Sequence, residues 1–343
     1  MKALCYMGPK DLALRDVAIP EPGPLDVLIK VRAVGICGSD VHGWLGITGR
    51  RIPPVIMGHE FSGVVAQVGS AVTRFAPGDA VIPQPINACG ECEYCRAGKN
   101  QLCSKRTLLG VMDINGAMAE YVSVPEHLLY RKPDGFSFET AALTEPFAVA
   151  YTAVRKRDDW EGKTVMIIGS GTIGLCILKM LRPYKPAKIL MCDLSDVRLE
   201  TALRMGADAV VNPRREDYLM QISRLTDGRM LDFTIEAVGV EATVNQSIRA
   251  LRPGGISVWV GVSQQEMTIN MHDVVTKDRT IIGSMNYSHL DFGEALRLLA
   301  AGKVDRPEEL ITKTVPLEQA AEMFTQLHDN PDGYLKVLIT FPE

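Results

Sequence analysis

The chain has 343 residues, of which 46% are hydrophobic and 23% charged, a composition typical of a soluble globular protein with more than one core. Its net charge of −4 gives no electrostatic reason to bind nucleic acid or an anionic membrane. No apolar run reaches the roughly 18 residues that cross a bilayer, and the first ten residues do not read as a signal peptide, so we expect a cytoplasmic protein.

The first 145 residues predict a β domain. Four short runs rich in β-branched residues are bounded by Gly, Pro or Asp, as strands between turns are: residues 26–36, 62–69, 79–84 and 119–125. Long helical periodicity is not found in this part of the sequence. We therefore predict an antiparallel, barrel-like β architecture here.

From about residue 146 onward, strand patterns and helix patterns alternate. Strands are predicted at residues 163–169, 188–193, 208–212, 231–239 and 256–262, and helices at residues 172–184, 196–206 and 241–251. Alternation of this kind predicts a parallel sheet with crossover helices. A helix at residues 291–304 and a last strand at residues 334–340 follow, where we expect the chain to return to the first domain. We place the first domain at residues 1–145 and 286–343 and the second at residues 146–285.

A glycine-rich motif, GSGTIG, runs from Gly169 to Gly174, directly after a predicted strand and at the start of a predicted helix. Gly169 permits a tight turn, Gly171 lets backbone N–H groups approach a pyrophosphate, and Gly174 lets the helix pack close to the strand. The N-terminus of the helix adds positive potential for phosphates. The motif predicts a dinucleotide site; the alternative is that the glycines only make a tight turn.

Asp193 ends the next predicted strand, 19 residues after Gly174. A carboxylate there can accept hydrogen bonds from both hydroxyls of the adenosine ribose and would repel a 2′-phosphate, so we predict NAD rather than NADP. Alternatively, Asp193 only caps a loop. Arg198 follows on the next helix and could contact adenine or a phosphate, or be a solvated helix residue. The other residues predicted to contact the cofactor are Thr172, Ile173, Val238, Val262 and Asn286.

Four of the eight cysteines crowd into the segment CGECEYCRAGKNQLC, as Cys89, Cys92, Cys95 and Cys103. Spacings of three, three and eight residues let four thiolates reach one point, and four thiolates with no open position make a structural zinc site. An iron–sulfur cluster and a redox dithiol are the alternatives, although the last spacing and the lack of a following Pro disfavour the bacterial ferredoxin pattern. Three other thiols lie in apolar patterns and are predicted to be inert: Cys5, Cys176 and Cys192.

Three further polar clusters stand in apolar surroundings. GICGSDVHG carries Cys37, Ser39, Asp40 and His42, MGHEFSG carries His59 and Glu60, and LTEPFAVA carries Glu145. A thiolate, an imidazole and one or two carboxylates can hold Zn²⁺ while leaving one position open for water or substrate, which is the catalytic kind of site.

With these motifs in this order, the sequence resembles the zinc-containing medium-chain alcohol dehydrogenase family over essentially its whole length, and most of all the polyol branch with the sorbitol and galactitol-phosphate dehydrogenases. The resemblance implies an α/β fold: an N-terminal GroES-like β-barrel catalytic domain and a Rossmann domain with a doubly wound parallel sheet. It also implies hydride transfer between NAD(H) and a secondary alcohol or ketone, and a homodimer or homotetramer. The substrate class it favours is a polyol, a sugar alcohol or its phosphate.

Carried over position by position, the resemblance makes Cys37 and His59 ligands of the catalytic zinc and Glu60 a ligand or close neighbour. Glu145 matches a carboxylate that binds this zinc directly or through water in the polyol enzymes. Asp40 matches an acid that orients the ligand histidine. Two further residues match a relay that passes the alcohol proton to solvent: Ser39 and His42. Zinc would act as a Lewis acid that makes the bound alcohol more acidic.

Some positions depart from the family pattern or stay open. Asn286 stands where sorbitol dehydrogenases carry an Arg, and Met118 stands where relatives often have Phe. The pair Arg50 and Arg51 could bind a phosphate or carboxylate of the substrate, or be a solvated loop pair.

A threonine- or sugar-acid-type zinc dehydrogenase is one alternative function, and a non-catalytic zinc- and nucleotide-binding protein is another. Four histidines are predicted to be structural: His127, His272, His289 and His328.

Overall fold

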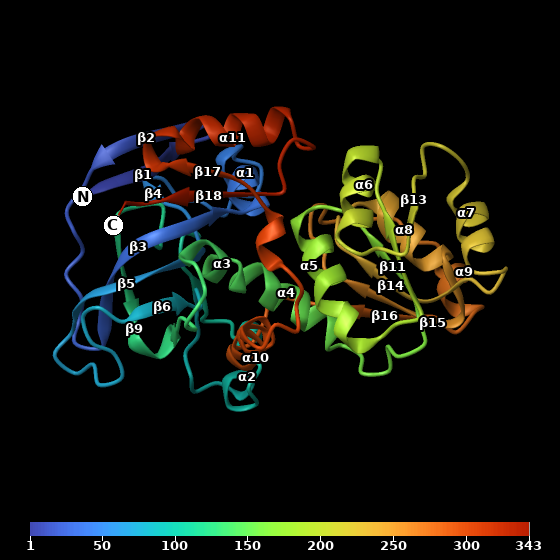
Figure 1. Ribbon diagram of the computed structural model, residues 1–343, viewed down its shortest axis with the longest axis horizontal. Coiled ribbons are helices and arrows are strands. Elements are labelled where there is room, and N and C mark those ends of the chain that lie inside the picture. Colours follow the sequence, from blue (N-terminus) through green and yellow to red (C-terminus); the bar gives the residue numbers. More distant parts are fainter. Residues whose placement is uncertain (343) are drawn as a thin grey trace. The chain divides into compact units, whose positions relative to one another are not determined.

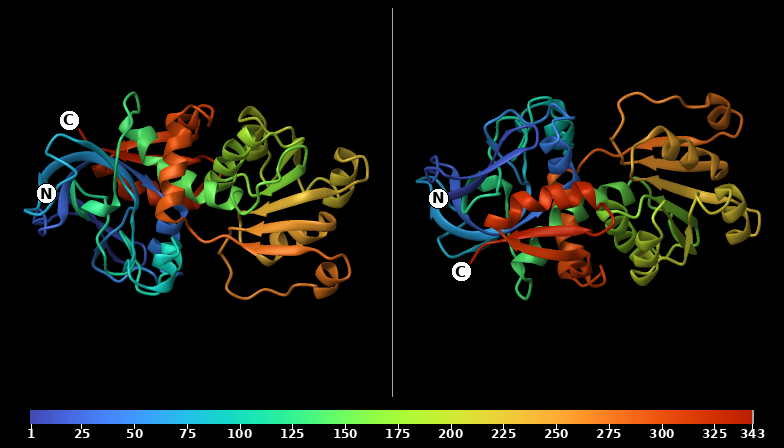
Figure 2. Two further views of the ribbon diagram at one scale, coloured as in Figure 1. Left: turned by 90° about the horizontal axis from the view of Figure 1, so that it is seen from below. Right: turned by 90° about the horizontal axis from the view of Figure 1, so that it is seen from above.

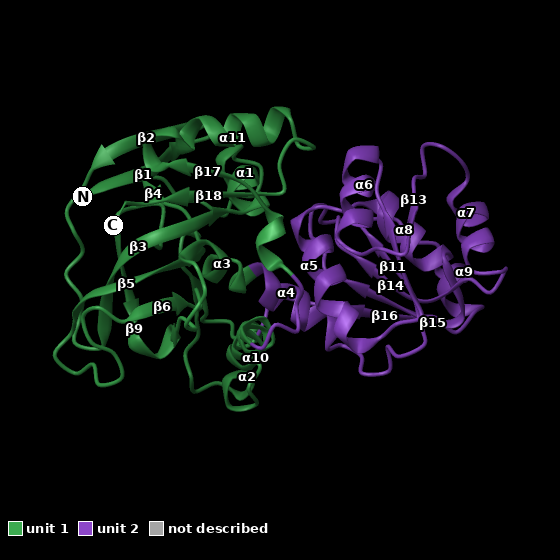
Figure 3. Cartoon of the chain, in the orientation of Figure 1, with its two compact units in different colours: residues 1–145, 288–300, 306–343 green, residues 146–287, 301–305 purple. Residues whose placement is uncertain are grey.

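The structure is a computed structural model that describes residues 1–342 (Figure 1). It divides into two compact units (Figure 3). Unit 1 comprises residues 1–145, 288–300 and 306–343, and unit 2 comprises residues 146–287 and 301–305. Among the described residues, no helix is both long enough and apolar enough to cross a membrane.

Unit 1 is built mainly from strands. They are β1 (Lys2–Gly8), β2 (Asp11–Asp16), β3 (Asp26–Ile36), β4 (Val55–Ile56), β5 (Glu60–Val68), β6 (Ala80–Pro83), β7 (Ile86–Asn87), β8 (Thr107–Leu108), β9 (Tyr121–Pro125), β10 (Leu129–Arg131), β17 (Ile311–Pro316) and β18 (Lys336–Thr340). Its helices are α1 (Gly38–Trp44), α2 (Glu93–Arg96), α3 (Phe138–Ala142), α10 (His289–Ala300) and α11 (Ala320–Asp329), and α4 (Thr144–Val154) begins in this unit.

The central strand of unit 1 is β3, which pairs antiparallel with β5, β9 and β18 in a seven-stranded sheet. Val27, Ile29 and Val31 alternate along β3, so they point to one face, where they are fully buried in the core cluster of this unit. The main sheet runs in the order β10-β6-β5-β3-β18-β17, and smaller sheets join β2-β1-β4 and β7-β8. The predicted β domain is confirmed.

Unit 2 alternates strands and helices. The strands are β11 (Thr164–Ile168), β12 (Lys188–Cys192), β13 (Ala209–Val211), β14 (Leu231–Glu236), β15 (Leu251–Trp259) and β16 (Thr280–Gly283), and the helices are α5 (Thr172–Leu181), α6 (Asp196–Arg204), α7 (Tyr218–Leu225), α8 (Glu241–Arg249) and α9 (Met271–Val275). All five strand pairs are parallel, in the order β13-β12-β11-β14-β15-β16. Figure 2 shows these strands side by side, with helices packed along the sheet.

This strand order reverses direction at β11, which lies between β12 and β14. Because crossovers between parallel strands are right-handed, the reversal places α5 and α6 on one face of the sheet and α8 on the other. The sheet is therefore doubly wound, as predicted, and the point of reversal is where sheets of this kind bind ligands.

The structure adds helices that the sequence patterns did not indicate. α4 is one of them, and nearly all of its residues are buried. A helix buried all round carries no amphipathic stripe, so its sequence lacks the 3.6-residue period by which helices are recognised. The start of β15 also differs from the prediction, because the strand begins at Leu251, five residues before the expected start.

Candidate functional site

The candidate catalytic site begins where β3 ends. Cys37 is the N-cap of α1, and its backbone N–H donates to the Asp40 carboxylate at 3.1 Å in a capping box. His59 and Glu60 stand at the start of β5, whose register pairs Glu60 with Gly35 of β3. A side chain at Gly35 would collide with the Glu60 carboxylate, so glycine is required for this close approach.

Antiparallel pairing thus brings three ligand types together in unit 1. Cys37 Sγ, a ring nitrogen of His59 and a carboxylate oxygen of Glu60 all lie within 4.8 Å of one another. Sulfur, nitrogen and oxygen donors in one group of three suit Zn²⁺ with an open position. The donor set therefore fits a catalytic zinc ion.

Negative charges surround His59. Burial disfavours its protonation, but the charges of Asp40, Cys37 and Glu145 outweigh that effect and raise the pKa of His59 to about 10. Asp40 Oδ1 lies 3.6 Å from His59 Nδ1. Surroundings that favour a proton on His59 favour a metal cation as well, so zinc binding would displace a proton.

Arg51 forms a buried ion pair within this site and is not available to bind a substrate. Its Nη2 donates to Asp40 Oδ1 at 2.8 Å, and both side chains are at most 2% exposed. Arg51 also donates to the carbonyl oxygen of Arg50 at 3.0 Å. The idea that the arginine pair binds a phosphate or carboxylate is therefore wrong for Arg51, because a buried guanidinium paired with Asp40 offers no anion site.

A second buried ion pair holds Glu60. Lys336 Nζ lies 2.6 and 2.9 Å from the two Glu60 oxygens and 3.3 Å from the carbonyl oxygen of Ile36. Lys336 is the first residue of β18, which pairs with β3. The pairing of these strands places Lys336 beside Glu60, although the two residues are 276 positions apart in the sequence. The lysine neutralises a carboxylate that would otherwise be a costly buried charge.

The remaining residues predicted for this site lie around it. Ser39 and His42 are exposed on α1, three residues apart and hence on one side of the helix. Glu145, 8% exposed, is in the first turn of α4. It is not part of the group of three ligands, yet its charge contributes to the raised pKa of His59.

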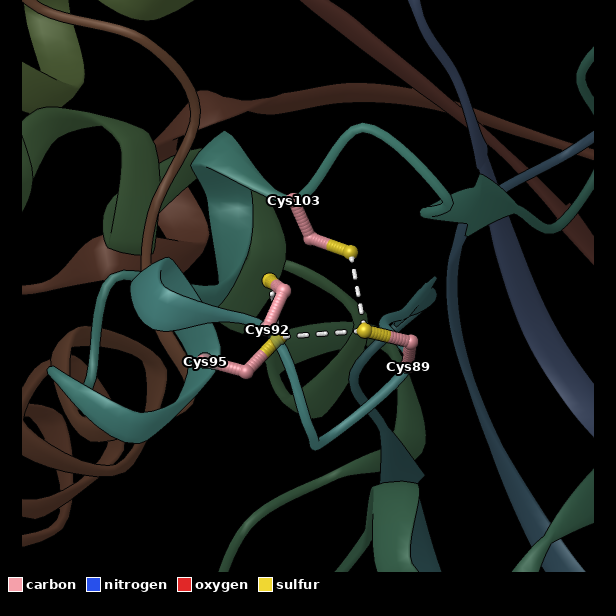
Figure 4. Close-up of side chains that lie close together, drawn as sticks. All are labelled: Cys89, Cys92, Cys95 and Cys103. Atoms are coloured by element: carbon pink, nitrogen blue, oxygen red, sulfur yellow. Dashed lines mark hydrogen bonds between the residues drawn. The ribbon is translucent and has the colours of Figure 1, made fainter.

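The four-cysteine cluster forms a separate group in unit 1 (Figure 4). The distances are 3.5 Å for Cys92 Sγ to Cys95 Sγ, 3.5 Å for Cys89 Sγ to Cys103 Sγ and 3.9 Å for Cys89 Sγ to Cys95 Sγ. A tetrahedron of sulfurs around Zn²⁺ has edges of about 3.8 Å, since each Zn–S bond is about 2.3 Å. The cluster therefore has the size of a zinc site before any metal is added.

The thiols of this cluster differ in acidity. Backbone N–H groups of Glu91 and Cys92 lower the pKa of Cys89 to about 6, whereas burial and the neighbouring Cys92 thiol raise the pKa of Cys95 to about 12. All eight cysteines of the chain are free, so none of the four is held in a disulfide. Zinc would bind with release of the remaining thiol protons.

The glycine motif adopts the geometry that a dinucleotide needs. Gly169 has a φ of +99°, and Gly171 is the N-cap of α5. A side chain at Gly174 would collide with the carbonyl oxygen of Gly169, so only glycine lets α5 start this close to β11. The helix N-terminus is thus presented at the carboxyl end of the central strand.

Asp193 follows β12 directly and is tied to the glycine motif. Its carboxylate accepts the backbone N–H of Ser170 at 2.7 Å and that of Ser195 at 3.0 Å. Two hydrogen bonds leave capacity on a carboxylate that offers about four acceptor positions. Arg198 lies one turn into α6, and its Nη1 is 4.0 Å from the position that a Gly171 Cβ would take.

The other predicted cofactor residues lie at the same edge of the sheet. Thr172 and Ile173 open α5, whereas Val238, Val262 and Asn286 follow β14, β15 and β16. Carboxyl ends of neighbouring parallel strands meet at one edge, so the topology gathers these residues. Val262 is 80% exposed, and Asn286 has a φ of +41°.

Two family models and many known proteins match this chain. Residues 23–134 match the family model described as "Alcohol dehydrogenase GroES-like domain", and residues 172–301 match the one described as "Zinc-binding dehydrogenase". A sorbitol dehydrogenase of Bacillus subtilis is 33% identical over 99% of this chain and 97% of its own.

The chain belongs to the zinc-containing medium-chain dehydrogenase family.

Other members of this family extend the comparison. D-xylulose reductase A of Aspergillus oryzae is 36% identical over 88% of this chain and 86% of its own. The structure of galactitol-1-phosphate dehydrogenase from Escherichia coli superposes with a TM-score of 0.92 at 29% identity, covering 99% of this chain and all of the other. Two further matching structures, at 32% and 29% identity, contain NADP and NADH.

Sequence reasoning missed Lys336 and Glu236, which shape the sites of this dehydrogenase, and it gave Arg51 a different role. Arg51 and Lys336 are partners of Asp40 and Glu60, and no spacing in the sequence connects them. Glu236, fully buried at the end of β14, accepts the backbone N–H groups of Val238 and Gly239 at 2.9 and 2.8 Å and so holds the loop beside the glycine motif. The only sign of Glu236 in the sequence was a carboxylate within an otherwise mostly apolar predicted strand.

Proposed function

We propose that this protein is an NAD-dependent zinc dehydrogenase that oxidises a secondary alcohol of a polyol, a sugar alcohol or its phosphate to a ketone. The observation that carries the proposal is the group of three zinc ligands, Cys37, His59 and Glu60, in a chain that also contains a dinucleotide fold. Unit 1 is proposed as the catalytic domain and unit 2 as the NAD domain.

Each residue of the catalytic site has a proposed role. Zinc, when bound, supplies a Lewis acid that makes a substrate hydroxyl more acidic. Cys37 and His59 hold the metal, with Glu60 as a further ligand or close neighbour. Asp40 orients the His59 ring. Glu145 approaches the metal directly or through water.

The proton of the alcohol needs a path to solvent. Ser39 and His42 are proposed to provide it, because both are exposed on one side of α1, directly after the ligand Cys37. A hydroxyl can accept and donate a hydrogen bond in the same step, and an imidazole can take up a proton on one ring nitrogen and release one from the other.

The cofactor preference rests on Asp193. Its carboxylate is proposed to accept hydrogen bonds from the two adenosine ribose hydroxyls, and the same charge disfavours the 2′-phosphate of NADP. We expect Asp193→Ser to weaken NAD⁺ binding far more than NADP⁺ binding. Equal losses for the two cofactors would remove this argument.

The substrate class is proposed from the relatives together with this chain's own residues. The relatives named above are dehydrogenases or reductases of sorbitol, D-xylulose and galactitol 1-phosphate. Asn286 in place of an arginine disfavours sorbitol itself. Since Arg51 is buried, Arg50 is the member of the pair that remains a candidate for binding an anionic group of the substrate. If the substrate is a phosphate or a sugar acid, its KM should rise in Arg50→Ala.

The direct test supplies zinc-loaded protein with NAD⁺ and a panel of free polyols, polyol phosphates, sugar acids and threonine, and follows NADH absorbance. Selective turnover of one group, lost in Cys37→Ser and His59→Ala, is the expected result. If those variants, folded and with zinc at the four-cysteine cluster, kept full turnover, the mechanism would be wrong. NADH binding without turnover of any alcohol or ketone would favour the non-catalytic alternative.

The location and the assembly of the protein are also proposed. We propose a cytoplasmic location and, from the family resemblance, a homodimer or homotetramer. Equilibrium sedimentation of the purified protein measures the assembly.

A further inference from the structure

Asn212 lies beside Asp193 in unit 2, at the edge of the sheet where the cofactor is proposed to bind. Cys192 of β12 pairs with Val211 of β13. Asp193 and Asn212 are the residues that follow, so they leave two neighbouring parallel strands at the same edge. The Asp193 N–H donates to the Val211 carbonyl oxygen at 3.3 Å, and Asn212 is 6% exposed. A buried amide therefore stands next to the acid on which the cofactor preference rests.

The direction of the Asp193 carboxylate is set by two backbone groups. One oxygen accepts the N–H of Ser170 in the glycine motif, and the other accepts the N–H of Ser195. Ser170 is fully buried, whereas Ser195 belongs to the turn of residues 194–196, in which Leu194 is 49% exposed. Side-chain packing does little to hold this turn, so its position depends on hydrogen bonds.

The side chain of Asn212 supplies two of these hydrogen bonds. Its Nδ2 donates to the Leu194 carbonyl oxygen at 3.4 Å and to Asp196 Oδ1 at 2.6 Å. Hydrogen bonds from Arg215 and Asn212 lower the pKa of Asp196, so at neutral pH the acceptor is a carboxylate, which makes a stronger hydrogen bond than a neutral group does. Both donor positions of the amide are therefore used on the turn that contains Ser195.

Asn212 is itself held by α7. Gln221 Nε2 donates to the Asn212 carbonyl oxygen at 2.9 Å, and Gln221 Oε1 accepts the Asn212 N–H at 3.2 Å. Asn212 Oδ1 accepts the backbone N–H of Arg214 at 2.9 Å. A continuous series of hydrogen bonds thus runs from α7 through Asn212 and the turn 194–196 to Asp193 and the glycine motif.

We propose that Asn212 is a positioning residue for the choice of cofactor: it holds the turn 194–196, which fixes the Asp193 carboxylate and so lets this carboxylate favour NAD over NADP. The inference rests on the proposed role of Asp193. Because ordering a mobile group opposes binding, a carboxylate that is already held binds the ribose hydroxyls more tightly. Its repulsion of a 2′-phosphate also depends on where the charge lies. Loss of Asn212 should therefore change the ratio of the two affinities, which a general loss of stability would not do.

The experiment measures the dissociation constants of NADH and NADPH by fluorescence titration of the zinc-loaded full chain, well below its melting temperature. Asn212→Ala should raise the constant for NADH at least about fivefold, the size expected for loss of a hydrogen bond, and leave that for NADPH within about twofold. Equal changes for the two cofactors, or no change for either, would overturn the proposal.

The matched control is Asn245→Ala in the same unit. Asn245 Nδ2 also donates two hydrogen bonds, to the carbonyl oxygens of Glu241 and Thr268, both at 2.9 Å. This variant should keep the wild-type ratio of the two constants. A shift as large as that of Asn212→Ala would overturn the proposal, because loss of an unrelated amide would then have the same effect.

A reciprocal exchange keeps the test decisive if Asn212→Ala does not fold. Asn212→Asp has nearly the same shape as the wild type but replaces the donor by a carboxylate that faces Asp196, so it should lose the preference for NADH. The double variant Asn212→Asp, Asp196→Asn exchanges donor and acceptor and should recover most of that preference. A double variant no more selective than Asn212→Asp would overturn the proposal.

Asp193→Ser, measured in parallel, separates failure of this inference from failure of the proposed cofactor preference. If Asp193→Ser lost the preference for NADH while Asn212→Ala kept it, only the role of Asn212 would be overturned. If the wild type had no preference, or if both variants kept it, the role of Asp193 would fall and that of Asn212 with it. None of these measurements depends on dehydrogenase turnover.

Discussion

Asp40 meets three different groups within unit 1. Oδ2 accepts the Cys37 N–H, whereas Oδ1 accepts a hydrogen bond from Arg51 and faces His59. Its side chain is fully buried, so the charge is sustained only by these neighbours. One carboxylate thus joins the end of β3, the start of β5 and the loop that carries Arg51.

We expect Arg51→Met to cost about 3–5 kcal/mol of unfolding free energy, because it leaves the Asp40 charge buried without a partner. The affinity for the catalytic zinc should fall as well, since Asp40 would no longer be held against His59. Chemical denaturation and zinc competition with a chelator measure the two effects.

The neighbouring Arg50→Met is the matched control and should change neither quantity. The double variant Asp40→Asn, Arg51→Met removes both charges and should recover most of the lost stability. If Arg51→Met were as stable as Arg50→Met, the buried pair would not be needed.

At the scale of elements, hydrogen bonds between side chains and neighbouring strands hold the sheet of unit 2. Asp232 on β14 accepts the Thr164 N–H of β11 at 2.9 Å and pairs with Arg252 of β15 at 2.8 Å. Burial opposes the charge, but the Thr164 N–H and Arg252 outweigh it and hold the pKa of Asp232 below its usual value. One aspartate therefore links three adjacent strands.

Asp232→Asn should destabilise the protein by about 1–3 kcal/mol at pH 7. Because the pKa of Asp232 is lower in the folded than in the unfolded state, its charge stabilises the fold above the unfolded pKa of about 3.9, and this stabilisation is lost as the pH falls through the folded value. Urea unfolding at pH 7 and pH 3.5 should show the variant and wild type converging in acid. The exposed Asp158→Asn serves as control, and a gap that persisted in acid would contradict the argument.

Gly174→Ala tests the contact between α5 and β11. The added methyl group would overlap the Gly169 carbonyl oxygen, so the helix would have to move away from the strand. We expect a loss of more than about 2 kcal/mol of stability, as for other overpacked sites, and at least tenfold weaker NADH binding. Fluorescence titration with NADH and thermal unfolding measure these losses.

Gly283→Ala is the control for stability in the same sheet, because nothing lies within 4 Å of its added methyl group. It should melt within about 2 °C of wild type. NADH binding by Gly174→Ala at wild-type strength would show that the close approach of helix and strand is not required.

At the scale of the whole molecule, the two proposed zinc sites should contribute differently. The four-cysteine cluster lies in a segment with few buried residues, whereas the proposed ligands Cys37 and His59 lie directly after β3 and directly before β5, two strands of the main sheet. Metal at the first site should therefore support folding, and metal at the second should support chemistry.

We expect Cys89→Ser and Cys37→Ser each to lower the zinc content from two ions per chain to one. The first should lower the melting temperature by about 5 °C or more, and the second should abolish turnover with a smaller effect on melting. Elemental analysis and scanning calorimetry make the comparison. Two zinc ions retained in both variants would refute the assignment of the sites.

The sequence predicted those features in which neighbouring residues act together. The glycine motif and the run of four cysteines are local, because their members share one turn or one loop, and the alternation of strands and helices indicated the parallel sheet. Helix α4 was missed because a helix that is buried on almost every side has no periodic pattern. Arg51 and Lys336 were missed as partners because their pairing depends on which segments become neighbours in the folded chain.

By itself, then, the sequence determined the fold class, the glycine motif and the residues that could ligate two zinc ions. The tertiary structure alone decided which charges neutralise one another, since a buried carboxylate must find a cation and the cation comes from whichever strand or loop packs beside it. That is why Arg51 changed from a candidate for the substrate to the partner of Asp40.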